Sequence, residues 1–212
     1  MVSDVPTLPN ERIAYLEELV HTARNAAAVF SQYTQLDVDR IVKPMVVAGL
    51  EQAQHLARMA VEETKLGVME DKAIKNMVAT EFVYNYVKDK PTVGVIREFP
   101  ERGVVEVAEP IGVILSLTPI TNPTSTVLFK CIMAIKTRNA VIFSPHPSAW
   151  RCCYEAVKVM YETALKHGAP EGVFSCLESH TLEDNTFLMH HKDIGLIDAT
   201  GGPSVVKAAY SS

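Results

Sequence analysis

An α/β fold is predicted for this chain, in the form of a parallel nucleotide-binding sheet preceded by a helical region and a β-hairpin. Two observations predict it. Before Pro91 the apolar residues recur at helical spacing, and beyond Pro91 short apolar runs alternate with helix-length segments. Continuous apolar strands joined by helices are typical of a parallel sheet covered on both faces, with right-handed crossovers. We therefore divide the chain into residues 1–91, 92–108 and 109–212.

The first unit, residues 1–91, is predicted to be helical. Its first helix has Asn10 as the expected N-cap, directly after Pro9. A second helical tract starts after Asp37 and runs towards Thr64, with Gly67 as its stop. The apolar residues of the first helix recur at steps of three and four: Ile13, Leu16, Val20, Ala23, Ala27 and Phe30.

Two later features complete this helical unit. Pro44 and Gly49 lie inside the second tract, so we expect a kink or a break there. A third tract runs from about Glu70 to Lys88, and Pro91 closes it. Its large apolar side chains are expected on one side of the helix: Ile74, Met77, Val78, Phe82 and Tyr86.

The second unit, residues 92–108, is predicted to be a β-hairpin. Thr92–Phe99 and Gly103–Ala108 show partial alternation, and the turn residues Pro100 to Gly103 separate them. The third unit, residues 109–212, alternates strands with helices, and Gly168-Ala169-Pro170 stops one of those helices. Strands are expected at 111–117, 139–144, 173–177 and 194–199, and helices at 123–137, 148–167, 183–190 and from about Ser204.

Composition excludes several classes of function. The 212 residues are 48% apolar and 21% charged, with a formal net charge of −5, so neither nucleic acid nor an anionic membrane surface is an expected partner. No apolar run has the ~20 residues that a membrane helix needs. The N-terminal MVSDVPTLPNER lacks the pattern of a secretory signal, so the expected compartment is the cytoplasm.

Cysteine and histidine spacing predicts neither a disulfide framework nor a metal site. Cys131, Cys152, Cys153 and Cys176 form no CxxC pair, and the seven histidines form no HxxxH. We expect these cysteines to be structural, because a nucleophile needs an accessible, electropositive setting.

Three polar turns follow the predicted strands. In Thr118-Pro119-Ile120-Thr121-Asn122, Asn122 is either a helix N-cap before Pro123 or an amide donor to a developing oxyanion. The prolines of Ser144-Pro145-His146-Pro147 aim Ser144 and His146 at whatever fills the crevice beyond the strands. Thr200-Gly201-Gly202-Pro203 is either a tight connection or a turn that lets a phosphate approach the next helix.

Four segments together resemble the CoA-acylating aldehyde dehydrogenases, especially the N-terminal half of bifunctional acetaldehyde–alcohol dehydrogenases. The resemblance runs from about residue 11 to Ser212, and its FSPHP and ATGGP turns differ from those of hydrolytic aldehyde dehydrogenases. The segments are VMEDKAIKNMVATEFVYNYVKDK, EPIGVILSLTPITNPTST, FKCIMAIKTRNAVIFSPHPSA and LMHHKDIGLIDATGGPSVVKAAYSS.

The resemblance implies an enzyme that converts an aldehyde, NAD and coenzyme A into an acyl-CoA and NADH, reversibly. A small aldehyde is then the substrate, with NAD as cofactor and coenzyme A as co-substrate. By position, Asn122 matches the asparagine that stabilises the oxyanion, and Thr118 to Thr121 match the loop near the nicotinamide. Ser144, Pro145 and His146 match the segment beside the adenosine, while Thr200, Gly201, Gly202 and Pro203 match the turn beside the pyrophosphate.

One element of the family is absent from this sequence. The family's catalytic cysteine lies downstream of the ATGGP turn, in a second domain, so we expect the 212 residues to be an inactive cofactor-binding portion. Two alternatives stay open: a fragment of a hydrolytic NAD(P)-dependent enzyme, and a non-catalytic assembly module. The predicted hairpin resembles an oligomerisation element, so a homo-oligomer is expected, and a filament if the protein is bifunctional.

Overall fold

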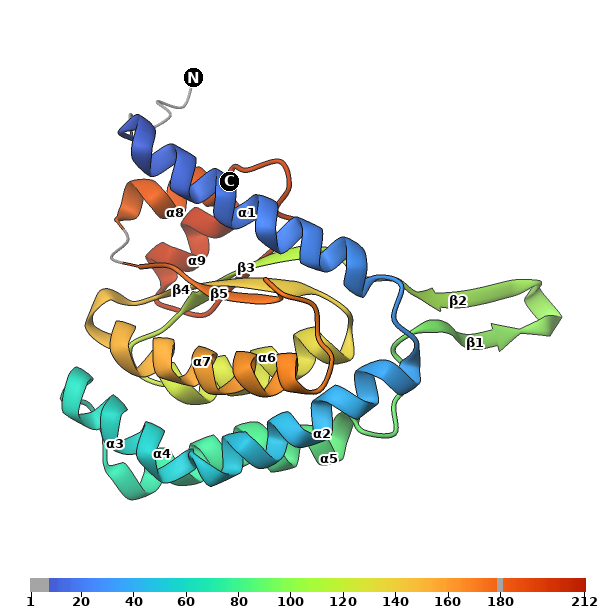
Figure 1. The fold of residues 1–212 in the computed structure, drawn as a ribbon, viewed down its shortest axis with the longest axis horizontal. Helices are drawn as coiled ribbons and strands as arrows, with labels where there is room; N and C mark the ends of the chain where they lie inside the picture. The colour runs from blue at the N-terminus through green and yellow to red at the C-terminus, as the bar shows by residue number, and fades with distance from the viewer. Residues whose placement is uncertain (1–7, 179–180) are drawn as a thin grey trace.

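The computed structural model describes residues 8–178 and 181–212, and a four-stranded parallel sheet is at its centre (Figure 1). The first seven residues, on which part of the expectation about a signal sequence falls, lie outside the described residues. The strand order is β5-β4-β3-β6. The strands are β3 (Val113–Thr118), β4 (Ala140–Pro145), β5 (Phe174–Cys176) and β6 (Leu196–Ala199).

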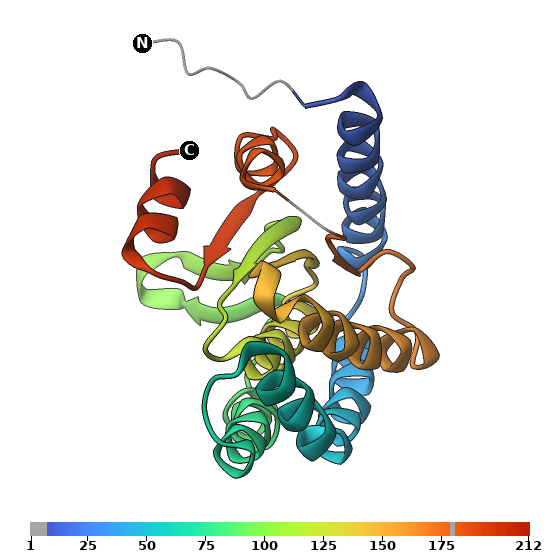
Figure 2. The same cartoon turned by 90° about the vertical axis from the view of Figure 1, so that its left-hand side faces the viewer.

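Helices cover both faces of this sheet, and further helices form an outer layer (Figures 1 and 2). Helix α1 (Asn10–Phe30) covers one face together with α8 (Leu182–Met189), and α9 (Pro203–Tyr210) follows β6. Helices α6 (Pro123–Lys136) and α7 (Trp150–Lys166) cover the other face. The outer layer, packed on α6 and α7, contains α2 (Gln35–Glu51), α3 (Ala53–Thr64), α4 (Met69–Met77), the π-helical turn η1 (Val78–Phe82) and α5 (Val83–Val87). The predicted α/β fold is confirmed.

The alternation of side chains along β4 creates two separate hydrophobic cores. Ala140 and Ile142 belong to the core under α1, whereas Val141 and Phe143 belong to the core shared with α6 and α7. All four side chains are at most 1% exposed. A strand that is apolar on both faces, as β4 is, therefore lies between two helical layers, as the sequence predicted.

The first two helices begin at positions other than those predicted. Asn10 is the first residue of α1 rather than its cap, because extended Pro9 occupies the cap position. Helix α2 begins at Gln35 and not after Asp37. Thr34 caps it in a reciprocal capping box: its Oγ accepts from the Asp37 backbone N–H at 3.3 Å, and the Asp37 carboxylate accepts from the Thr34 backbone N–H at 3.0 Å.

The break predicted around Pro44 and Gly49 lies slightly further along the chain. Helix α2 continues through both residues and ends at Glu51, so that Gln52 separates it from α3. The glycine serves close packing instead. A Cβ at Gly49 would lie 2.7 Å from Cγ2 of Thr80 and 3.3 Å from Cδ2 of Leu128, so a larger residue would push η1 and α6 away.

The apolar row predicted on the third helical tract faces solvent in the structure. Small and polar residues face inward instead: Asn76 donates to the carbonyl of Ala53 (2.9 Å) and accepts from the Thr124 hydroxyl (2.8 Å). Periodicity correctly placed these side chains on one face of the helix, but it did not tell whether that face is buried or exposed. The exposed fractions are 58% for Ile74, 44% for Met77, 45% for Val78, 65% for Phe82 and 72% for Tyr86.

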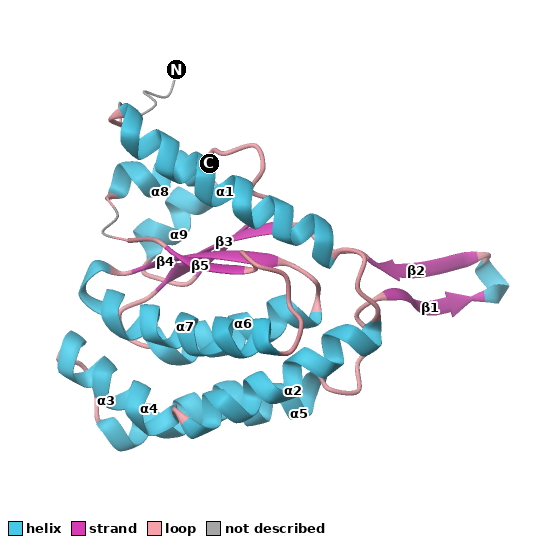
Figure 3. Cartoon of the chain, viewed as in Figure 1, coloured by secondary structure: helices cyan, strands magenta, loops and turns pink. Residues whose placement is uncertain are grey.

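The predicted hairpin is confirmed as a secondary-structure element. Strands β1 (Gly94–Phe99) and β2 (Val104–Ala108) pair antiparallel and project from the body of the molecule (Figure 3). The 3₁₀ turn η2 (Pro100–Arg102) joins them, and Gly103 follows with a φ of +61°, which glycine adopts most readily. At the base of the hairpin, the buried Arg138 donates to the carbonyl of Ala108 at 3.0 Å.

A partly buried ion pair attaches α8 to α1. The guanidinium of Arg12 donates to both carboxylate oxygens of Asp184, each at 2.9 Å, and the Asp184 side chain is 1% exposed. Asp184 also accepts from the backbone N–H of Thr181 (2.7 Å), which caps α8. Burial alone would raise the pKa of Asp184, but the hydrogen bonds from Arg12 and Thr181 together hold that pKa below its ordinary value.

We predict that Asp184→Asn lowers the free energy of unfolding at pH 7 by about 2–3 kcal/mol, because charge-assisted hydrogen bonds to a buried group are lost. A depressed pKa stabilises the fold above the unfolded-state value of about 3.9. That stabilisation is lost as the pH falls through the folded-state value. Denaturant unfolding at several pH values should therefore show the two proteins converging in acid.

The matched control is Asp193→Asn, since Asp193 pairs with Arg24 of the same helix α1. The side chains of this second pair are more exposed, 51% for Arg24 and 27% for Asp193. The N–O distance between them is 3.3 Å. Loss of the Arg24–Asp193 pair should lower the free energy of unfolding by less than about 1 kcal/mol. Equal costs for the two variants would contradict the importance given to the Arg12–Asp184 pair.

Candidate functional site

The register of the parallel sheet brings the three polar turns to one level. Leu117 of β3 lies opposite Ser144 of β4 on one side and opposite Ala199 of β6 on the other. Neighbouring strands lie about 4.8 Å apart, so the turns that follow these residues are side by side. All three leave the carboxyl ends of their strands, where open parallel sheets bind ligands.

A cavity of about 880 Å³ lies at this edge of the sheet. It brings together all the site residues predicted from the sequence except Pro203, which begins α9 beside it. Helix α8 contributes a further wall that sequence reasoning missed. The lining residues are Leu117, Thr118, Pro119, Ile120, Thr121, Asn122, Ser144, Pro145, His146, Pro147, Leu182, Asn185, Thr186, Met189, Thr200, Gly201, Gly202, Val205 and Ala208.

The side chain of Asn122 is not used to cap α6. Asn122 occupies the N-cap position before Pro123, but its side chain makes no capping hydrogen bond. Its Oδ1 instead accepts from Nζ of Lys75 at 3.1 Å. With the carbonyl oxygen of the amide engaged, the Nδ2 group remains as the donor available to a ligand.

Two lysines of α4 support the turn that carries Asn122. Lys75 contacts the Asn122 amide, and Nζ of Lys72 donates to the carbonyl of Thr121 at 2.9 Å. Burial, with a further contribution from the Lys75 charge, lowers the pKa of Lys72. Sequence reasoning missed both lysines: they lie almost fifty residues upstream of the turn, and the only local signal was their i, i+3 spacing on a predicted helix.

Ser144 is buried and bonded to helix α8. Its Oγ donates to Oδ1 of Asn185 at 2.6 Å, which links the end of β4 to the first turns of α8. Asn185 directly follows Asp184, so the ion pair to α1 also positions this part of the cavity wall. No sequence motif marked Asn185, because α8 approaches β4 only through the tertiary fold.

His146 is exposed and bonded locally. Its Nδ1 accepts from the backbone N–H of Ser148 at 3.1 Å, within the short 3₁₀ turn Pro147–Ala149. Across residues 8–178 and 181–212, no carboxylate hydrogen-bonds to this imidazole. The geometry therefore gives His146 no partner for proton transfer.

The glycines after β6 leave open space on the cavity side. A Cβ added at Gly202 would meet no atom within 4 Å, and one at Gly201 would only touch Val205 at 3.4 Å. Gly202 has a φ of −69°, which any residue can adopt. Neither backbone conformation nor packing within the described chain requires glycine at 202, so the open space suits the close approach of a ligand to α9.

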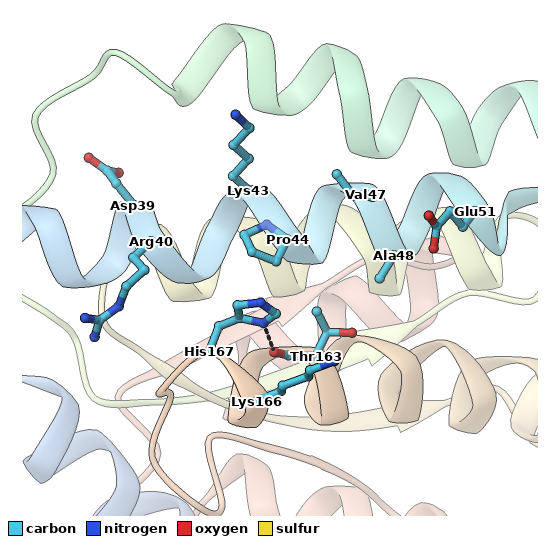
Figure 4. Close-up of a pocket in the computed structure, with 10 residues that line it drawn as sticks. All are labelled: Asp39, Arg40, Lys43, Pro44, Val47, Ala48, Glu51, Thr163, Lys166 and His167. Atoms are coloured by element: carbon cyan, nitrogen blue, oxygen red, sulfur yellow. Dashed lines mark hydrogen bonds between the residues drawn. The ribbon is translucent and has the colours of Figure 1, made fainter.

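A second hollow, of about 550 Å³, lies between α2 and the end of α7 (Figure 4). Several of its polar groups are engaged with neighbouring residues. Asp39 pairs with Lys136, Arg40 pairs with Asp37, and the His167 ring bonds to the carbonyl of Thr163. Because it lies away from all three strand-end turns, we take the cavity at the sheet edge as the candidate site.

The four cysteines are free and lie outside the cavity lining. Burial raises the pKa of Cys131 and Cys153 well above the ordinary value, and burial with a contribution from Glu178 raises that of Cys176 to about 12. Cys152 is fully buried, with its thiol directed at the carbonyl of Ala149 (3.3 Å). This setting is that of structural cysteines.

Two kinds of feature are absent from residues 8–178 and 181–212. Within them, no group of three or more His, Cys, Asp or Glu side chains is arranged to hold a metal ion. Likewise, none of the described helices combines the length and apolar character needed to cross a bilayer.

A parallel sheet with a cavity at its strand ends, bordered by a glycine turn and a helix N-terminus, is typical of nucleotide-binding α/β proteins. Comparison with known families is more specific. The model of the aldehyde dehydrogenase family matches residues 4–212, and the chain belongs to that family.

Acylating aldehyde dehydrogenases are among the proteins to which the chain is similar. The chain is 44% identical over 200 residues to the bifunctional aldehyde-alcohol dehydrogenase AdhE of Escherichia coli K12, covering 94% of this chain and 22% of that protein. It is 47% identical to an acetylating aldehyde dehydrogenase of Geobacillus thermoglucosidasius, with a TM-score of 0.92 over 95% of this chain and 45% of that one. The chain thus spans less than half the length of these relatives.

A more distant structure contains a CoA ester. Propionaldehyde dehydrogenase of Rhodopseudomonas palustris with bound propionyl-CoA is 31% identical, with a TM-score of 0.82 over 92% of this chain and 43% of that one. The resemblance seen in the sequence to acylating aldehyde dehydrogenases is therefore confirmed.

We predict that the native chain resists thiol alkylation at pH 8. Burial protects Cys131, Cys152 and Cys153, and with a pKa of about 12 roughly one in 10⁴ of the Cys176 side chains is thiolate at that pH. Iodoacetamide labelling followed by mass spectrometry should find four modifiable thiols only after unfolding. A single thiol that reacts in the folded chain as fast as free cysteine would show that a nucleophile had been overlooked.

Proposed function

We propose that this chain is the cofactor-binding portion of an NAD-dependent, CoA-acylating aldehyde dehydrogenase. The reaction would convert a small aldehyde, NAD and coenzyme A into an acyl-CoA and NADH, and would be reversible. The observation that carries the proposal is the convergence of the three polar turns on one cavity, in a chain whose similar proteins include acetylating enzymes.

In this proposal each turn binds a different part of the reacting complex. Asn122 donates from Nδ2 to the oxyanion that develops on the aldehyde oxygen, and Thr118 to Thr121 border the nicotinamide, which accepts the hydride when bound. Ser144, Pro145 and His146 flank the adenosine. Thr200, Gly201, Gly202 and Pro203 receive the pyrophosphate at the N-terminus of α9. The open space at Gly202 supports this last assignment.

The described residues provide the proposed cofactor site but no activated nucleophile. Acyl transfer to coenzyme A through a thioester requires an activated thiolate, and the four thiols here are buried or hold a raised pKa. We therefore expect no turnover from these 212 residues alone. A hydrolytic enzyme is the weaker alternative, because several of the similar proteins are named as acetylating or acylating enzymes.

Assembly is the second part of the proposal. Both strands of the hairpin expose apolar side chains, including Val95 (54%), Val104 (49%), Val105 (51%) and Val107 (51%). An exposed two-stranded ribbon of this kind suits pairing with another copy, so we propose a homo-oligomer, and a filament if the protein is bifunctional. The cytoplasm is the proposed compartment.

The three-part division of the chain is retained as a proposal. Helix α1 packs on the same sheet that carries the site, and α2 to α5 pack on the helices of its other face. Residues 1–91 and 109–212 then form one cofactor domain, from which the hairpin at 92–108 projects.

We predict that Gly202→Ala weakens NAD binding by about 5- to 100-fold, because the added methyl group occupies space that the pyrophosphate needs. The fold should tolerate the change, with a loss of stability of about 1 kcal/mol or less. Isothermal titration calorimetry with NAD measures the affinity, and thermal unfolding measures the stability.

Ser211→Ala at the opposite end of α9 is the control, since the Ser211 hydroxyl bonds only to its own helix and lies outside the cavity lining. It should leave NAD affinity unchanged. Unaltered affinity in Gly202→Ala, or failure of the unmodified chain to bind NAD, would count against the proposed function.

A further inference from the structure

The hydrogen bond between Ser144 and Asn185 leaves one acceptor and one donor unused on two residues that line the candidate site. Ser144 donates its proton to Oδ1 of Asn185 at 2.6 Å, so the lone pairs of Ser144 Oγ remain as acceptors. Within the described chain, no acceptor bonds to Nδ2 of Asn185, which therefore remains a donor. Both residues line the cavity. The pair offers one donor and one acceptor to a ligand.

A vicinal diol matches such a pair, because each hydroxyl of a diol both donates and accepts. The position in the cavity agrees with this match. Apolar side chains of α8 and α9, namely Met189, Val205 and Ala208, form a wall suited to a flat base, while the glycine turn suits a pyrophosphate. The ribose that joins a base to a pyrophosphate belongs beside these two regions, at the end of β4.

The pair is also held firmly. Ser144 is 3% exposed at the end of a buried strand. Asn185 follows Asp184, whose carboxylate is fixed by Arg12 and by the N-terminal cap of α8. A donor on a helix anchored in this way is pre-organised, so little conformational entropy is lost when a ligand binds.

We propose that Asn185, oriented by Ser144, recognises the adenosine ribose diol and thereby selects the dinucleotide that has no phosphate on this sugar. The inference rests on the proposed function. The charges of the lining support the selection: apart from His146, no described residue that lines the cavity is ionisable. A phosphate on the ribose would bring two negative charges and would replace the hydroxyl that hydrogen-bonds to Asn185. No lysine or arginine among the described lining residues would pair with those charges, so binding would be weaker.

The test measures the affinity of the chain for ADP, 2′-deoxy-ADP, 3′-deoxy-ADP, NAD and NADP by calorimetry. The unmodified chain should bind ADP about 3- to 10-fold more tightly than at least one deoxy analogue, as expected for one hydrogen bond. It should bind NADP at least about tenfold more weakly than NAD. Asn185→Ala should lose affinity for ADP but not for that deoxy analogue.

Thr186→Ala is the matched control. Thr186 lines the same cavity from the same helix, but its hydroxyl donates to the carbonyl of Leu182 at 2.9 Å, so its removal should leave the ADP to deoxy-ADP ratio unchanged. If Asn185→Ala weakens ADP and both deoxy analogues equally, the residue is only structural and the inference is overturned. If the unmodified chain binds neither ADP nor NAD, the proposed function itself fails.

Discussion

The pairing of β3 with strands on both sides is the constraint on which the rest of the structure depends. Parallel pairing with β4 and β6 aligns Ser144, Leu117 and Ala199 in one row, so three turns that are far apart in sequence leave the sheet together. The two cores follow from the same sheet, since side chains alternate between the layer under α1 and the layer under α6 and α7. The site exists because these strands end at one level.

Contacts from outside the sheet then stabilise the turns. Lys72 and Lys75 of α4 hold the turn that ends at Asn122, and they do so from the outer helical layer. The Arg12–Asp184 ion pair fixes α8, which brings Asn185 to Ser144. Helix α1 lines no part of the cavity. Through this ion pair it nevertheless determines the position of the cavity wall that α8 forms. The helical residues and the sheet are thereby coupled through packing.

The sequence predicted the features that depend on local chemistry. It did not predict features that depend on contacts between residues far apart in the chain. The strands, the hairpin and the three polar turns follow from apolar runs and from proline and glycine, and they are present. The assignment of Asn10 as an N-cap and the helix start after Asp37 were wrong, because Pro9 and Thr34 occupy the cap positions. The outward face of α4 and the roles of Lys75 and Asn185 depend on which elements pack together, which no local pattern records.

The central claim is that the three turns and α8 form one nucleotide site. Amide chemical shifts of the ¹⁵N-labelled chain, recorded while NAD is added, test this most directly. The account predicts that the largest shifts fall on the non-proline residues within 118–122, 144–147 and 200–203 and on Asn185 and Thr186. Saturable shifts confined to the hollow between α2 and α7, around Lys43 and His167, would contradict it, as would the absence of any shift at millimolar NAD.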